Sequence, residues 1–70
     1  MSLTKIEYPT LESTRTAVVS THAKYEIQER RELNTVVFFR VKPNRNLNEL
    51  QVVGIWSDTK NFGIVYDNID

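Results

Sequence analysis

The side chains that could carry out acid–base or nucleophilic chemistry are few in this sequence, and their spacing matches no catalytic motif. His22 is the single histidine, and Ser20 lies two residues before it. With one of the carboxylates, these two could be written as a hydrolase triad. The chain lacks the glycine-flanked nucleophile and the glycine-rich oxyanion turn that such sites use. We therefore predict no catalytic residue and expect that the protein is not an enzyme.

Metal and cofactor sites are disfavoured for a similar reason. The chain has no cysteine, and its one histidine stands among scattered Asp and Glu residues. This pattern does not reproduce the ligand spacing of zinc or calcium sites. The two glycines, Gly54 and Gly63, both fall within predicted strands, so no glycine-rich loop could cradle a phosphate. We predict neither a metal nor a cofactor.

One group of cations could bind a macromolecule through charge: Arg40, Lys42, Arg45 and Lys60. Residues 34–57 hold three basic residues and one acidic residue, and nearby aromatic residues could stack on bases. The ribonucleoprotein pattern of glycine and aromatic residues on one strand is absent, and aromatic residues in strands usually belong to the core. A small β-barrel that binds single-stranded nucleic acid through these four cations is therefore the alternative function.

The composition describes one small domain, residues 1–70, without a dominant charge. The 70 residues include nine basic and nine acidic side chains, so the chain as a whole has no electrostatic reason to bind nucleic acid or an anionic membrane. No apolar run approaches the roughly 20 residues that span a bilayer, and the N-terminus lacks the apolar core of a signal peptide. A chain without cysteine suits a reducing compartment, and we expect a cytoplasmic location.

Two apolar segments predict strands at the centre of a sheet. Residues 35–42 contain four consecutive large apolar residues, and residues 50–56 have nearly the same character. Strands that are apolar on both faces are typical of positions covered on both sides. Residues 58–61 predict a turn between two apolar stretches, in a hairpin that places Ile55 opposite Ile64 and Trp56 opposite Gly63.

These segments predict a mostly β fold, a small antiparallel meander sheet or barrel of four to five strands. The expected strands are residues 15–20, 23–30, 35–42, 49–57 and 62–67. In the hairpin of residues 23–42, Ile27 could face either Val36 or Val37, so the register stays open. Threonines among residues 10–21 argue against a helix there, because β-branched residues lose side-chain freedom in helices. The alternative is an α+β fold with a short N-terminal helix packed on the sheet.

A 70-residue chain has little material to cover both faces of such a sheet. We expect one face to be closed by curling of the sheet, with the following residues inside: Val53, Ile55, Phe62, Ile64 and Tyr66. The other face would carry Trp56, and either residues 1–20 or another chain would cover it. We predict a non-enzymatic protein–protein interaction module that binds a protein partner or forms a homodimer. The expected interface residues are Trp56, Val37, Phe39 and Val65.

Overall fold

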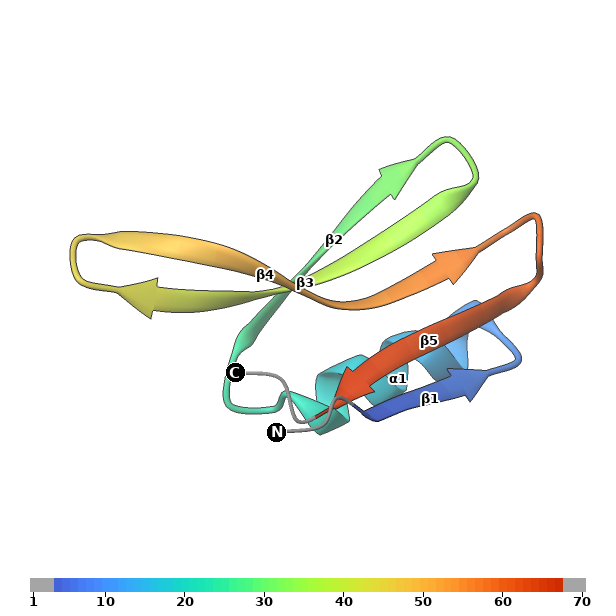
Figure 1. Cartoon of the computed structure of the whole chain (residues 1–70), viewed down its shortest axis with the longest axis horizontal. Coiled ribbons are helices and arrows are strands. Elements are labelled where there is room, and N and C mark those ends of the chain that lie inside the picture. Colours follow the sequence, from blue (N-terminus) through green and yellow to red (C-terminus); the bar gives the residue numbers. More distant parts are fainter. Residues whose placement is uncertain (1–3, 68–70) are drawn as a thin grey trace.

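The computed structural model describes residues 4–67, which form one antiparallel sheet and one helix (Figure 1). The elements in chain order are β1 (Thr4–Tyr8), α1 (Leu11–Thr21), β2 (Glu26–Glu32), β3 (Thr35–Asn44), β4 (Leu47–Ser57) and β5 (Phe62–Asp67). The strands lie in the order β1-β5-β4-β3-β2. The mostly β prediction is confirmed, and the short helix on the sheet is that of the α+β alternative.

Strands β2 to β5 follow the predicted meander, whereas β1 was not predicted. It returns to the far edge of the sheet and pairs with β5, so that Ile6 faces Val65 and Tyr8 faces Gly63. All residues of β1 except Tyr8 are exposed. Ile6 and Tyr8 alternate with Lys5 and Glu7, which is the pattern of a strand with one apolar face, but over five residues this signal is short.

The strand predicted at residues 15–20 is wrong, because this segment belongs to helix α1. Thr10 is the N-cap, and its hydroxyl accepts a hydrogen bond from the backbone N–H of Ser13 at 3.0 Å. The Thr14 hydroxyl donates to the Thr10 carbonyl at 2.8 Å. The helix ends at Thr21, and the N–H of its C-cap residue, His22, donates to the Val18 carbonyl. Two of the four threonines that disfavour a helix by propensity are thus used in its cap and in its first turn.

Helix α1 packs on the sheet through two residues four positions apart, Thr14 and Val18, both fully buried. Beneath them lie the two glycines of the chain. A β-carbon at Gly54 would lie 2.9 Å from Val18 Cγ2, and one at Gly63 would lie 2.8 Å from Thr14 Cγ2. The bare backbone at these positions therefore lets the helix approach β4 and β5 closely.

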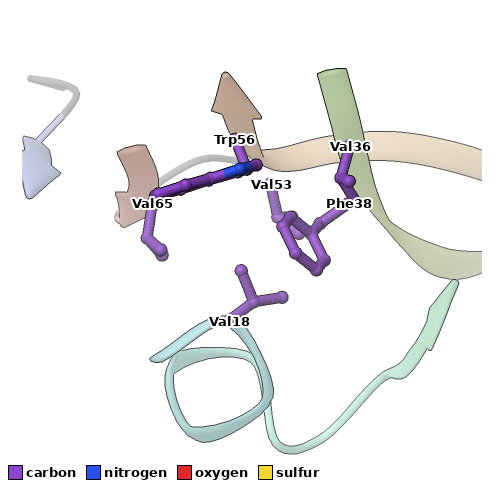
Figure 2. Packing of buried hydrophobic residues seen from close by; sticks show 6 residues of the cluster. All are labelled: Val18, Val36, Phe38, Val53, Trp56 and Val65. Carbon is purple, nitrogen blue, oxygen red and sulfur yellow. The ribbon is translucent and has the colours of Figure 1, made fainter. Parts of the chain in front are cut away.

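The hydrophobic core lies between α1 and this face of the sheet. Figure 2 shows Val18 pointing from the helix toward the buried residues of three strands: Val36, Phe38, Val53, Trp56 and Val65. The Trp56 indole Nε1 donates to Asp58 Oδ1 at 2.8 Å, and Asp58 Oδ2 is 2.9 Å from Arg31 Nη2. The tryptophan is thus fixed by packing and by one hydrogen bond at the rim of the core.

One of the two predicted hairpins has the expected register. In the β4–β5 hairpin Ile55 faces Ile64 and Trp56 faces Gly63, as predicted. In the β2–β3 hairpin both open registers are wrong, because Ile27 faces Arg40. Strand β2 continues through the charged residues 29–32, so the turn to β3 consists of residues 33 and 34 alone. Each residue of β2 therefore pairs with a residue farther along β3 than expected.

Strands β3 and β4 form a longer hairpin than predicted, with a bulge. Strand β3 continues past Pro43, and Arg45 has a φ of 55° in the tight turn that follows. The register shifts where Phe38 faces Gly54 and Phe39 faces Val52, which leaves Val53 as the extra residue. The bulge turns Val53 into the core beneath α1, so its expected place beside Ile55 and Ile64 is wrong.

The end of the β3–β4 hairpin, residues 42–49, pairs with no third strand among residues 4–67. It forms an arm that projects from the rest of the sheet, away from the paired strands β1 and β5 (Figure 1). The arm ends in a turn followed by Leu47, an exposed residue. Within residues 4–67, no helix is long enough and apolar enough to cross a membrane.

Candidate interaction surface

The sheet has a second face, opposite to α1, that is apolar across its three central strands. Side chains alternate along a strand, so Val37 points away from the helix, because its neighbours Val36 and Phe38 point into the core. Facing residues of adjacent strands share a face. Val37 faces Ile55 on β4, and Ile55 faces Ile64 on β5. These three residues form a row across the middle of the sheet.

Further pairs extend this row in both directions. Phe39 faces Val52 and Val41 faces Leu50 toward the arm, while Phe62 faces Ser57 at the other end. We call this surface the open face: Val37, Phe39, Val41, Leu50, Val52, Ile55, Phe62 and Ile64. Each of these side chains is half-buried or exposed. Among residues 4–67 no element packs on the open face, since α1 contacts β1, β4 and β5 from the other side.

Charged residues on the two outer strands border the open face. Strand β1 contributes Lys5 and Glu7, which stand opposite Tyr66 and Ile64. Strand β2 contributes four polar side chains: Glu26, Gln28, Arg30 and Glu32. The guanidinium of Arg30 lies 5.6 Å from the centre of the Phe39 ring. The open face therefore has an apolar centre and a polar rim of both signs, which is the layout of protein interfaces.

A shallow cavity of about 260 Å³ lies at the β4–β5 end of the open face. Its lining residues are Thr35, Ile55, Ser57, Lys60, Phe62 and Ile64. Three of these residues are apolar, and Lys60 is the one charged residue of the lining. A cavity of this size has room for one large side chain.

The four residues predicted for the interface lie on two different faces. Val37 and Phe39 belong to the open face. Trp56 and Val65 lie in the core beneath α1, where they are only 5% and 1% exposed. The Trp56 face is covered by α1, which agrees with the alternative that residues 1–20 fold over it and not with cover by another chain. The face expected to be closed by curling of the sheet is the open one. The feature of the sequence that could have identified the covered face is the pair of glycines, Gly54 and Gly63, because a helix can approach a sheet closely where side chains are missing.

The four cations predicted for nucleic-acid binding do not form one patch. Arg40 is 6% exposed, its Nε donates to Gln51 Oε1 at 2.7 Å, and its guanidinium stacks 4.4 Å from the centre of the Tyr25 ring. Lys42 lies on the arm and Arg45 in the turn before β4. Lys60 lies in the turn after β4, and the eleven residues of β4 span roughly 35 Å in extended form.

A polar cavity of about 460 Å³ lies near the C-terminal end of α1, and both Ser20 and His22 contribute to its lining. The His22 ring contacts other groups through both nitrogens. Its Nε2 donates to the Tyr66 carbonyl at 2.8 Å, and in this tautomer Nδ1 faces Arg40 Nη1 at 3.4 Å. These contacts join the end of the helix to β5 and β3. His22 is therefore buried because it connects these elements, which is a structural role.

Residues 4–67 contain no group of three or more His, Asp or Glu side chains arranged to hold a metal ion. The chain matches no protein-family model, no curated protein and no solved structure. The geometry of its own residues is therefore the basis for a functional proposal.

Proposed function

We propose that the chain is a non-enzymatic protein–protein interaction module and that the open face is its contact surface. The observation that carries the proposal is the continuous row of apolar side chains across β3, β4 and β5, on the face that α1 does not cover. Contiguous apolar surfaces of this kind mark contact sites in proteins of this size.

The energetics of the open face favour a partner. Its eight aliphatic and aromatic side chains are only partly covered within the chain. Completing the burial of one such side chain contributes on the order of 1 kcal/mol. A protein partner that covers most of them therefore gains several kcal/mol, of which a part offsets the entropy lost on association.

A site-specific photo-crosslinking experiment tests this proposal. A photoreactive phenylalanine analogue replaces Phe39 on the open face or, as a control, Val19, which is 50% exposed on α1. We expect crosslinked adducts from position 39 but not from position 19 in the cells that produce the chain. The adducts should disappear when Val37→Glu is added. Equal crosslinking from both positions, or adducts that persist with Val37→Glu, would contradict the proposal.

A further inference from the structure

We infer that the partner on the open face is a second copy of this chain, packed sheet against sheet with the two helices outside. This inference rests on the proposed function and identifies the partner. The resulting dimer has four layers, in the order helix, sheet, sheet and helix. Two sheets packed in this way lie about 10 Å apart, with their side chains interdigitated.

The size of the open face meets what a stable dimer needs. The molecule measures 38 × 27 × 18 Å, and the strands lie across its two longer dimensions (Figure 1). The roughly 800 Å² that each partner buries in a standard interface is about a sixth of the 4969 Å² accessible surface of the chain, so one of its two broad faces can supply it. The shortest extent, 18 Å, corresponds to one helix packed on one sheet. A second sheet packed on the open face would add a second apolar layer between the two sheets.

The charge distribution is compatible with self-association. Nine basic and nine acidic residues give the chain no net charge, so two copies approach one another without net repulsion. The rim of the open face carries both signs on each outer strand, with Lys5 and Glu7 on β1 and Glu26 and Arg30 on β2. A twofold axis can place opposite charges of the two rims near one another.

The outer strands disfavour the other route to a dimer, which is pairing between sheet edges. Strand β2 has the sequence EIQERRE, in which five of seven residues are charged. Strand β1 carries Lys5 and Glu7 and is followed by Pro9. Charged residues and proline at edges prevent the addition of a further strand. The open face is thus the apolar surface through which two copies can meet.

A matched pair of valine substitutions tests the dimer. Val37→Glu places a carboxylate at the middle of the open face, where Arg30 stands opposite on β2 and can pair with it in the free chain. Val19→Glu makes the same change on the exposed side of α1. In the dimer, Val37→Glu buries a charge on each copy, so we expect its dimer dissociation constant to rise about a hundredfold or more. The Val19→Glu protein should resemble the wild type.

The measurement is sedimentation over a range of protein concentrations, with circular dichroism as the check of folding. We expect a wild-type dimer, a folded Val37→Glu monomer and a Val19→Glu dimer. If Val37→Glu does not fold, Val52→Glu replaces it, since Val52 is already exposed and lies on the same face. A wild-type chain that is monomeric at every concentration would overturn the inference, and so would a dimer that neither open-face variant dissociates.

The crosslinking experiment separates failure of this inference from failure of the proposed function. Adducts from position 39 with twice the mass of the chain support the dimer. Adducts of a different mass that disappear with Val37→Glu contradict the dimer but leave the interaction module intact. Absence of adducts specific to position 39 contradicts both.

Discussion

Thr14 on α1 packs directly on Gly63 of β5, and neither residue can grow without displacing the other. A β-carbon at position 63 would lie 2.8 Å from Thr14 Cγ2 and 2.9 Å from Trp56 Cε3. Thr14 cannot turn away freely, because it is fully buried and its hydroxyl is bonded to the Thr10 carbonyl. The contact sets the distance between the helix and the sheet.

Gly63→Ala should therefore destabilise the protein through overpacking. We expect a loss of about 1–3 kcal/mol in the free energy of unfolding, measured by urea denaturation. Thr14→Ala removes the Thr14 atoms that the new methyl group would meet and leaves only the contact with Trp56 Cε3. In the Thr14→Ala background, Gly63→Ala should cost clearly less than in the wild type. Equal costs in the two backgrounds would show that Thr14 does not limit the space at position 63.

Trp56→Ala should unfold the chain and not merely dissociate it from a partner. The tryptophan is buried beneath α1, and truncation of a core tryptophan commonly costs about 3–5 kcal/mol. Trp56→Phe, which keeps an aromatic ring but loses the N–H bond to Asp58, should cost less. Circular dichroism and sedimentation together give the readout. A Trp56→Ala protein that keeps its strand signal as a monomer would contradict the burial of this residue.

His22→Ala should lower stability by about 1–3 kcal/mol, because it removes the side chain of a buried residue together with its hydrogen bond to the Tyr66 carbonyl. His22→Gln carries an amide N–H at a similar reach and should recover part of this loss. Thermal unfolding of the three proteins makes the comparison. If both variants were as stable as the wild type, the contact between His22 and β5 would not contribute to the stability of the fold.

Oligonucleotides should not bind this chain with useful affinity. Arg40 is buried and engaged within the protein, and Arg45 and Lys60 lie in turns at opposite ends of β4. Too few exposed cations lie together to release many counterions from a strand. An electrophoretic shift assay at low salt, with single- and double-stranded oligonucleotides, is the measurement. A shift that is lost with charge reversal at Lys42 and Arg45 would instead favour the nucleic-acid alternative.

The sequence by itself determined the centre of the sheet. The apolar runs in β3 and β4, and the turn between β4 and β5, predicted these strands and the β4–β5 register correctly. Alternation also separated Trp56 and Gly63 from Ile55 and Ile64 on opposite faces. These features are local, because strand propensity, alternation and turn chemistry all favour the same structure there.

The tertiary structure alone decided the helix, the register of β2–β3 and the bulge. The threonines give residues 11–21 a low intrinsic preference for helix, and the packing of Thr14 and Val18 on the sheet outweighs this cost. Strand β2 extends through charged residues because β3 offers partners for its backbone as far as Glu32. The bulge at Val53 moves one apolar side chain to the other face, and no period in the sequence indicates it.

Which face of the sheet α1 covers was also determined by the tertiary structure, and the candidate interaction surface depends on this choice. Both faces of the central strands are apolar, so hydrophobicity does not distinguish them. They differ in shape, because Gly54 and Gly63 have no side chains on one of the two faces. Val18 and Thr14 of α1 occupy the space above these glycines. Close packing against that backbone places α1 there and leaves the row from Val37 to Ile64 open on the other side.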